Sequence, residues 1–395
     1  MPDMKEDREM KENRKTVRIF GAASFFNDLG SDIIYPVWPL FVTTVLGANM
    51  AVLGFLDGLG DALVSISQAA AGYVSDRIRK RKVFVWTGYI MGSASRIGYA
   101  FSSVWQNLIP FRILDRAGKI RGAPRDAIIA DVSTDENRGA NFGLLRAADN
   151  LGAVCGIAIC ILFFKMLGYK KLFLLAAIPS LVGAFLVICL AREKKTERKI
   201  YKGLTFRDID SNFRLFLILS SFFALGSFSY SFLLIYAKTA GFRIAFIPVF
   251  YLLFTAIAFA ASIPFGRLSD RIGRKSVIMI SFFLWALVCV NCVLLRAYWS
   301  VILTFVLYGA HKGAIEPVQK AFVSELVPAQ YRAGSLGAFQ MVTGLCALPA
   351  SLFAGLLWDK IGEFLPFLFS FSLTMVAIVM MFFVKEKKRS DNNKG

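Results

Sequence analysis

The sequence has little of the chemistry on which enzymes and metal proteins depend. Its 395 residues include one histidine and six cysteines, and Asp, Glu, Lys and Arg together make up only 18%. The cysteines follow no spacing typical of a zinc site and fall inside apolar runs, so we expect free thiols without a disulfide framework. A phosphate-binding P-loop, a His-Glu-x-x-His pair and a nucleophile elbow are also missing. We therefore predict no enzyme, no metal site and no cofactor.

Neither a signal peptide nor a large polar domain is visible in the sequence. The first 16 residues carry both signs of charge without an apolar stretch, so we expect no cleaved signal peptide. The longest polar connection, residues 192–213, is too short for a folded domain. A non-transporting membrane scaffold or receptor is therefore the least favoured reading.

An excess of apolar residues is what the sequence does have. Hydrophobic residues make up 56% of the chain, more than a soluble core of this size needs. Twelve runs are long enough to cross ~30 Å of hydrocarbon as helices. They lie near residues 18–43, 50–75, 83–103, 106–131, 139–164, 170–191, 214–239, 245–269, 276–296, 299–325, 332–358 and 363–384. We predict an all-α membrane protein whose twelve transmembrane helices form two pseudo-symmetric six-helix bundles.

The distribution of the basic residues predicts an orientation. The sequence has 46 Lys and Arg against 27 Asp and Glu, and most of the basic residues lie at the termini and in alternate connections. The other side of the membrane holds only Lys165, Lys170, Lys171, Lys238, Arg243, Arg296 and Lys360. This asymmetry predicts that both termini are cytoplasmic in the inner (plasma) membrane. No basic segment alternates with stacking aromatic residues, so we expect no nucleic-acid partner.

An internal repeat predicts how the chain is divided. Gly72-Tyr-Val-Ser-Asp76-Arg77 recurs 194 residues later as Gly266-Arg-Leu-Ser-Asp270-Arg271, which indicates two parallel copies of one six-helix unit. The expected parts are a cytoplasmic tail at 1–17, bundles at 18–191 and 214–384, a cytoplasmic linker at 192–213 and a second tail at 385–395.

The repeated segment resembles the signature G-x-x-x-D-[RK]-x-G-[RK]-[RK] of the major facilitator superfamily. The second copy matches it throughout, up to Gly273, Arg274 and Lys275, whereas the first copy has Arg79 where the glycine is expected. By this resemblance, the arginine that follows the aspartate pairs with an acid on the fourth helix of its half. The resemblance implies a cytoplasmic latch of Gly72, Asp76, Arg77, Asp131, Gly266, Asp270, Arg271 and Glu325. The alternative is that these residues only set the topology.

Further motifs resemble the twelve-helix drug:proton antiporter branch of that family. The first helix contains Leu29-Gly30 followed by Pro36 and Pro39 at the spacing L-G-x5-P-x-x-P. The fifth helix contains Gly152-x-x-x-Gly156, but the proline that usually follows is replaced by isoleucine. The segment from Asp115 to Asp131 resembles the corresponding segment of a bacterial branch of the family. Membership in that branch does not indicate a substrate.

The first half carries an unusual number of charges inside its apolar runs. Because unpaired charges in a membrane interior are costly, we predict a paired network that faces a cavity and couples transport to protons. Its members are Asp28, Asp32, Asp57, Asp61, Arg96, Arg112, Asp115, Arg116, Lys119, Arg146 and Asp149. Asp32 and Asp61 lie nearest the expected midplane. The alternative is that these pairs are purely structural clamps.

The second half contributes fewer charges and more aromatic side chains. The candidate residues of the substrate cavity are Asn27, Tyr35, Tyr230, Tyr236, Tyr251, His311, Lys312, Glu316 and Gln340. For His311, a hydrogen-bonded packing role is an equal alternative.

These observations together predict a secondary active transporter that works by alternating access. We expect a monomer surrounded by membrane lipid, with a small organic molecule as substrate and protons as the coupling ion, and we favour export by antiport. The alternative is a proton-coupled transporter of an anionic metabolite or a siderophore-type metal chelate, which the basic excess of the fourth helix favours.

Overall fold

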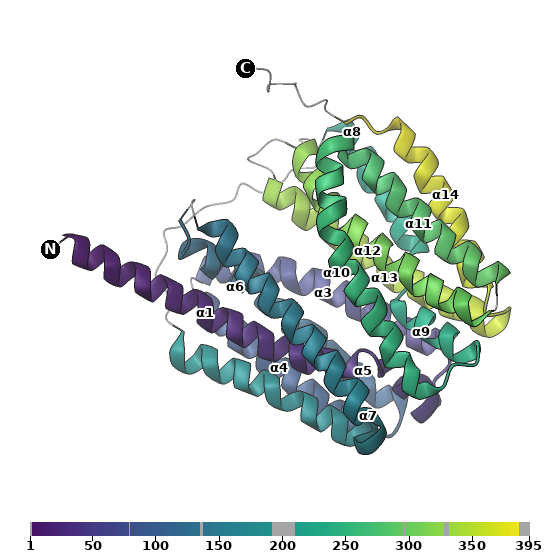
Figure 1. Cartoon of the computed structure of the whole chain (residues 1–395), viewed down its shortest axis with the longest axis horizontal. Coiled ribbons are helices and arrows are strands. Elements are labelled where there is room, and N and C mark those ends of the chain that lie inside the picture. The colour runs from purple at the N-terminus through teal and green to yellow at the C-terminus, as the bar shows by residue number, and fades with distance from the viewer. Residues whose placement is uncertain are drawn as a thin grey trace. The chain divides into compact units, whose positions relative to one another are not determined.

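The computed structural model describes residues 2–78, 80–134, 137–191, 210–295, 297–327 and 332–386, and within these ranges the regular structure is helical (Figure 1). The chain divides into two compact units. Unit 1 comprises Met1–Asn49, Leu59–Lys199 and Arg243–Val249. Unit 2 comprises Met50–Gly58, Ile200–Phe242 and Phe250–Gly395. The predicted domain boundaries stay a prediction, and most of the predicted linker and of the predicted C-terminal tail lies outside the described residues.

Unit 1 is built around the long helix α7. Its elements are α1 (Pro2–Ile34), α2 (Trp38–Leu40), the π-helical turn η1 (Phe41–Val45), most of α3 (Met50–Ile78), α4 (Arg81–Phe101), η2 (Trp105–Asn107), α5 (Leu108–Ala117), η3 (Gly118–Arg121), α6 (Gly122–Asp131) and α7 (Arg138–Leu190). Both α1 and α4 pack along α7. The interface buries Val17 and Phe20 of α1 with Val85 and Tyr89 of α4. Apolar burial at this junction fixes how the three helices meet.

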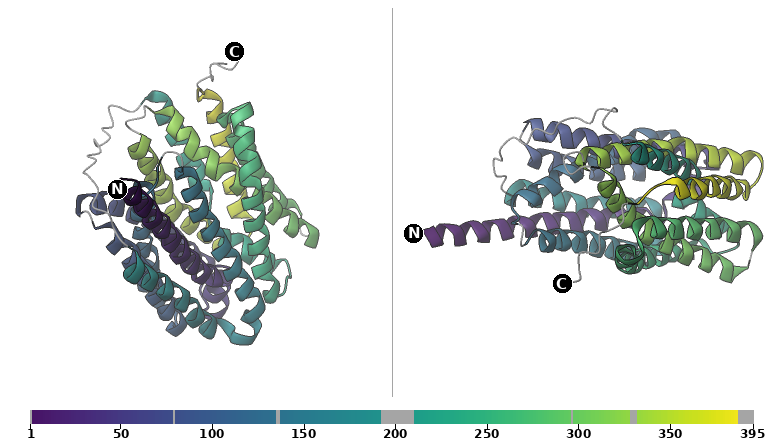
Figure 2. Two further views of the ribbon diagram at one scale, coloured as in Figure 1. Left: turned by 60° about the vertical axis from the view of Figure 1, so that its left-hand side comes forward. Right: turned by 90° about the horizontal axis from the view of Figure 1, so that it is seen from above.

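Helix α1 begins earlier than the sequence suggested. Residues 2–17 of the predicted tail already lie in α1, which starts at Pro2, and Figure 2 shows its first turns extending beyond the ends of α4 and α7. The segment is rich in Lys, Glu and Arg, which favour helix without needing a buried face. The polar N-terminal segment thus continues the first apolar helix as one rod.

Several predicted helices are interrupted at glycine or proline. The predicted helix 18–43 breaks after α1 at Pro36, which cannot donate a backbone hydrogen bond, and resumes as α2 and η1. The predicted helix 106–131 consists of α5, the 3₁₀ turn η3 and α6. The predicted helices 139–164 and 170–191 form α7, interrupted at Gly168, whose φ of 64° suits a residue without a side chain.

Unit 2 contains the remaining helices and is rich in aromatic contacts. They are α8 (Ser211–Gly226), α9 (Tyr230–Thr239), most of α10 (Ile247–Ile272), α11 (Arg274–Leu294), α12 (Tyr298–Leu326), α13 (Arg332–Lys360) and α14 (Leu365–Phe383). The short turn η5 (Ile244–Phe246) before α10 belongs to unit 1. Between α8 and α9, the Ser229 side chain accepts a hydrogen bond from the Ser231 amide and caps α9. The rings of Phe223 and Phe282 stack with centroids 4.2 Å apart and join α8 to α11.

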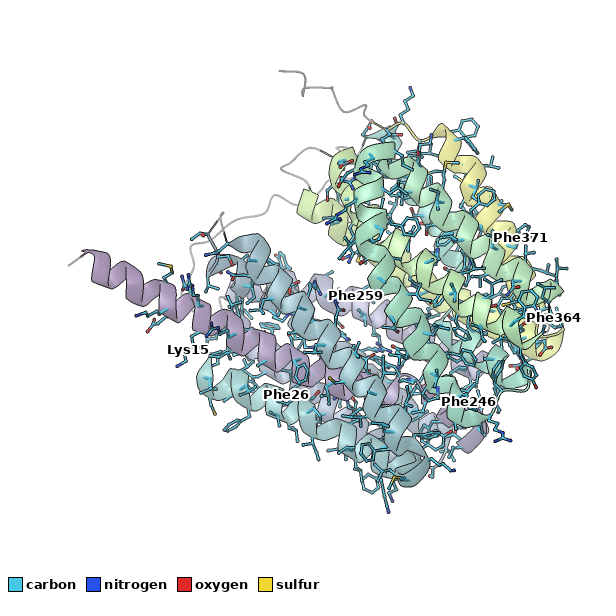
Figure 3. The ribbon with its side chains drawn as sticks, in the orientation of Figure 1. Lys15, Phe26, Phe246, Phe259, Phe364 and Phe371 are labelled. Carbon is cyan, nitrogen blue, oxygen red and sulfur yellow. The ribbon has the colours of Figure 1, made fainter. Side chains whose placement is uncertain are left out.

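Among the described residues, seven helical segments are long and apolar enough to cross a membrane. They are Met50–Ser75, Ala140–Leu190, Ser211–Thr239, Ile244–Ile272, Arg274–Leu294, Gly334–Lys360 and Leu365–Phe383. Many large apolar side chains on these segments are exposed, among them Phe246 and Phe259, which are both more than half exposed (Figure 3). Such exposure is expected of a surface that meets lipid. The number of twelve crossings stays a prediction.

Candidate functional site

Arg96 of α4 lies at the centre of the buried charges of unit 1. Its side chain is 2% exposed and is held by neutral oxygens from α1 and α7. Nη1 donates to the Ala176 carbonyl at 2.8 Å and to Ser180 Oγ at 2.6 Å. Nη2 donates to Ser31 Oγ at 2.8 Å and to the Asn27 carbonyl at 3.4 Å. Four acceptors thus replace the water that this guanidinium would have outside the fold.

A chain of hydrogen bonds leads from Arg96 to a carboxylate. Ser180 Oγ, which accepts from Arg96, donates to Asn27 Oδ1 at 3.1 Å. Asn27 Nδ2 in turn donates to Asp28 Oδ1 at 2.8 Å. The amide of Asn27 therefore connects a buried cation with an acid on the same helix, which gives this predicted cavity residue a defined place in the network.

Gly30 makes room for this arrangement. A Cβ atom at Gly30 would lie 2.5 Å from the Ala176 carbonyl oxygen and closer still to Arg96 Nη1. Any larger residue would therefore displace the guanidinium or the α7 backbone. The glycine of the predicted L-G-x5-P-x-x-P motif thus has a packing reason at this position.

The glycine pair of α7 has a similar role on the other side of α1. A Cβ at Gly152 would lie 3.1 Å from the Leu29 amide nitrogen, and one at Gly156 would lie 3.1 Å from Asp32 Cβ. The two helices can approach closely only because both positions lack side chains. Asp32 itself is 9% exposed and is held in this α1–α7 contact.

A second group of cations lies at the end of α5 and stacks on aromatic rings. The Arg112 guanidinium lies 4.4 Å from the ring centre of Trp38, and that of Arg116 lies 5.3 Å from the ring centre of Tyr35. Arg116 Nε also lies 3.5 Å from Asp115 Oδ2. All three charged side chains are buried, so cation–π contacts and one carboxylate stabilise two adjacent positive charges.

Arg116 Nε lies near the Asp115 carboxylate but does not form a hydrogen bond with it. Its Nε is buried and, among the described residues, lacks a hydrogen-bond acceptor. Gly60 of α3 lies alongside, and a Cβ there would be 3.1 Å from the Nε atoms of Arg112 and Arg116. The charge of this side chain is balanced by Asp115 and by the ring of Tyr35.

A third group joins α6 to α7 and α1. Arg125 Nη1 donates to Ser24 Oγ at 2.7 Å and to Asp149 Oδ1 at 3.2 Å, while Nη2 lies 3.0 Å from Asp126 Oδ1. Arg146 bridges the same two acids, with Nη1 3.3 Å from Asp149 Oδ2 and Nη2 3.5 Å from Asp126 Oδ2. Two arginines and two aspartates balance here, although the Arg146 side chain is 61% exposed.

Helix α3, which carries two of the predicted network residues, belongs to both units. Asp57 lies in unit 2, where Ser229 Oγ donates to its Oδ2 at 2.8 Å, and its membership in one network with the acids of α1 stays a prediction. Asp61, one turn later, lies in unit 1 and is exposed rather than buried. Lys119 lies half-buried on η3. The two acids of α3 share a helix face but not an environment.

In unit 2, His311 is enclosed by hydrogen bonds and rings. Its Nδ1 lies 2.9 Å from the Ser281 carbonyl oxygen, and Ser281 Oγ donates to the His311 carbonyl at 3.2 Å. The rings of Phe223, Trp285 and Tyr308 lie around the imidazole. These contacts favour the packing role over substrate binding.

The other predicted cavity residues of unit 2 fall into three groups. Tyr230 and Tyr251 form an aromatic cluster with Phe254, with ring centres 5.3 Å apart for the tyrosine pair. Tyr236 instead donates from its hydroxyl to the Leu295 carbonyl at 3.1 Å. The remaining three lie on α12 and α13: Lys312 and Glu316 are 3.9 Å apart, and Gln340 is exposed.

The predicted latch forms around a different arginine in each half. Arg274, the first residue of α11, lies 2.8 Å from Asp270 and 3.1 Å from Glu325. In unit 1 the ion pair to Asp131 comes from Arg81, the first residue of α4. The predicted Arg77 and Arg271 are exposed at helix ends and do not make these contacts in the described structure, because the helix that follows brings its own first arginine to the acid.

The register of the first copy also differs from the prediction. Since Arg81 and Arg274 make equivalent contacts, the residue opposite Gly273 is Lys80, not Arg79. Both residues are the N-cap of the following helix, and Gly273 has a φ of 98°. The first copy is thus one residue longer. A Cβ at Gly72 would be 3.5 Å from Ala123, one at Gly266 would meet open space, and the Asp76 side chain lies outside the described residues.

Sequence reasoning missed the neutral partners of these charges. Ser24, Asn27 and Ser31 lie three to four residues apart on α1. Ser24 accepts a hydrogen bond from Arg125, and Asn27 and Ser31 accept hydrogen bonds from the buried Arg96. Such spacing places small polar side chains on one face of a helix, and it was visible in the sequence. Ser180 carried no comparable signal, because its role depends on how α7 packs.

Comparison with known proteins agrees with this architecture. The family model of the Major Facilitator Superfamily matches residues 20–260 and 215–395. An MFS-type transporter of Methanocaldococcus jannaschii is 36% identical over 391 residues, which cover 96% of each chain. The multi-drug resistance efflux pump PmrA of Streptococcus pneumoniae is 23% identical, covering 80% of this chain and 82% of the pump.

Among solved structures, the nucleoside transporter NupG superposes with a TM-score of 0.76 at 14% identity, covering 93% of this chain and 98% of that one. At such identity the likeness concerns the fold alone. The sequence matches are what identify the family. The chain therefore belongs to the Major Facilitator Superfamily, and it is an integral membrane secondary transporter rather than an enzyme.

Proposed function

We propose that this transporter exports a small organic solute in exchange for protons, by alternating access of two six-helix bundles. The observation that carries the proposal is the set of buried carboxylates paired with arginines in unit 1. Asp115 and Asp149 are each at most 9% exposed, and each lies within ion-pair distance of an arginine. Ionisable side chains inside membrane helices commonly mark proton pathways, because their charge is tolerated only while a partner is in place.

The proposed topology has twelve crossings, with both termini cytoplasmic in the plasma membrane and the chain acting as a monomer. The 51-residue apolar segment Ala140–Leu190, interrupted at Gly168, is long enough for two crossings joined by a tight turn. Helices α5 and α12 contain charged residues, which lower their apolar content. We propose that they are also parts of crossings, because charged residues inside a membrane can be buried against other helices.

Asp32 is the acid we propose to carry the proton. It lies on α1, just before the break at Pro36, and α1 packs against the small-residue face of α7. Replacing it with asparagine keeps the shape of the side chain and removes its charge. Helix α1 could then still pack, while the exchange of a proton would be lost.

Transport into proteoliposomes driven by a pH gradient tests the proposal. The panel would contain cationic, neutral and anionic compounds. We expect Asp32→Asn to abolish gradient-driven transport of the responsive compound while leaving the protein folded and inserted. Glu12→Gln is the matched control, because Glu12 is an exposed acid on the same helix. An Asp32→Asn protein that keeps the wild-type pH dependence would refute the coupling role.

A second candidate substrate class is an anionic metabolite or a siderophore-type metal chelate. It is favoured by the adjacent buried cations Arg112 and Arg116 and by the buried Nε of Arg116, which lacks an acceptor among the described residues. Competition within the same panel separates the classes. Inhibition by carboxylates and chelates, without inhibition by cations, would favour the anionic substrate.

A further inference from the structure

A groove at one end of unit 1 combines four cations with an apolar floor. Its volume is about 440 Å³, and it lies between the polar end of α1 and the last turns of α7. The walls are lined by Lys11, Arg14, Lys15 and Arg18 of α1, and the floor by Ile19 and Ala22 of α1 with Leu186 and Leu190 of α7. The groove is separate from the ion pairs of Arg125 and from the latch.

The position of the groove matches the edge of a bilayer. Leu190 is the last residue of the apolar segment that begins at Ala140, so the floor lies where hydrocarbon ends. The cations from Arg18 to Lys11 extend along α1 for about 10 Å at 1.5 Å per residue. Lipid headgroups occupy a layer of this kind outside the ~30 Å hydrocarbon core. The cations therefore lie at the depth of lipid phosphates.

The four cations repel one another in this structure. Lys11 and Lys15 are four residues apart on one helix face, as are Arg14 and Arg18, and like charges at this spacing destabilise a helix. All four residues are exposed, and within the described residues none of them forms an ion pair with a carboxylate. Among the described residues, the hydrogen bond of the Arg14 guanidinium goes to Met10 Sδ, at 3.8 Å. An external anion would relieve this repulsion.

We propose that this groove binds the headgroup of an anionic membrane lipid, with its phosphate on the cations of α1 and the start of an acyl chain on the floor. The apolar floor distinguishes this occupant from free phosphate, which would gain nothing from Leu186 and Leu190. Basic side chains beside a membrane span attract anionic headgroups with about 1 kcal/mol each. The inference rests on the membrane location of the chain, not on the proposed substrate or direction.

The experiment measures retention of phosphatidylglycerol by the full-length protein in detergent, using native mass spectrometry and thermal unfolding. Phosphatidylcholine is the neutral comparison lipid. We expect Lys15→Gln to weaken phosphatidylglycerol binding about fivefold and the double change Lys11→Gln with Lys15→Gln to weaken it further. The matched control is Lys165→Gln with Lys171→Gln, which removes the same charge from exposed positions of α7 outside the groove.

The outcomes are distinct. Equal retention by the groove variant and the control variant, or equal retention of phosphatidylcholine, would overturn the proposal. So would stabilisation by inorganic phosphate that matches that of phosphatidylglycerol, because it would indicate a phosphate site. Leu190→Ser tests the floor: it should weaken lipid binding while leaving the charge unchanged. Transport is assayed separately, so inactivity with intact lipid binding would count against the proposed function alone.

Discussion

Replacing Gly30 with alanine tests whether the packing of α1 on α7 positions Arg96. The added Cβ would lie 2.5 Å from the Ala176 carbonyl oxygen and would also overlap Arg96 Nη1. Ordinary contacts of this type need about 3.5 Å, so the guanidinium or the helix must move by roughly 1 Å. Such a shift breaks the bonds of 2.6 Å to Ser180 and 2.8 Å to Ser31.

The expected cost follows from the charge of Arg96. A hydrogen bond to a charged group contributes about 1.5–3 kcal/mol, and a buried ion that loses its partners costs about 3–5 kcal/mol. We therefore expect Gly30→Ala to lower the free energy of unfolding by about 3 kcal/mol or more. Denaturation by SDS in mixed micelles measures this change. Transport should fall in the same variant, because the link from Arg96 through Asn27 to Asp28 is disturbed.

The matched control is Gly143→Ala, since a Cβ at Gly143 of α7 would meet nothing within 4 Å. This change should be neutral or stabilising by up to about 1 kcal/mol, because alanine favours helix more than glycine does. In the double variant Gly30→Ala with Arg96→Gln, the free energy of unfolding should fall by less than the sum of the two single effects, since both changes disturb the same hydrogen bonds. A Gly30→Ala protein as stable and active as the control would refute this account of Arg96.

Two further variants test contacts of unit 2. Asp270→Asn removes one of the two carboxylates that contact Arg274. We expect this change to increase the labelling of engineered cytoplasmic cysteines by a water-soluble thiol reagent. Labelling equal to that of the wild type would indicate that the latch residues only set topology. The Asp359 carboxylate accepts hydrogen bonds from the first two backbone amides of α3, at 3.0 and 2.7 Å. We expect Asp359→Ala to lower the free energy of unfolding, measured by SDS denaturation, by about 1 kcal/mol. An unchanged midpoint would contradict this capping role.

Much of the site could be located from the sequence, but its pairing could not. The intramembrane arginines and aspartates stand out because apolar helices rarely contain them. The expectation that carboxylates neutralise the arginines is too simple for Arg96, whose four acceptors are hydroxyl and carbonyl oxygens. Two of these come from residues about eighty positions away on α7. Such partners depend on how helices pack, and no local pattern encodes them.

The latch shows that the sequence did not indicate which arginine contacts the acid in each half. The first copy has one extra residue before α4, so Arg81 rather than Lys80 takes the place that Arg274 has in the second copy. The family resemblance had implied Arg77 and Arg271, the arginines that directly follow the two aspartates. The contacts come instead from Arg81 and Arg274, each the first residue of the next helix.

The sequence by itself determined the helical character, the internal repeat and the family, because apolar runs, breaking prolines and glycines, and repeated loops are local properties of the chain. It also determined which helices carry charge. Only the tertiary structure decided that α3 belongs to both units, with Asp57 bound to Ser229 and Asp61 exposed, and that Gly30 leaves space for Arg96. These features depend on the approach of helices distant in sequence, where differences of about 1 Å decide whether two side chains meet or clash.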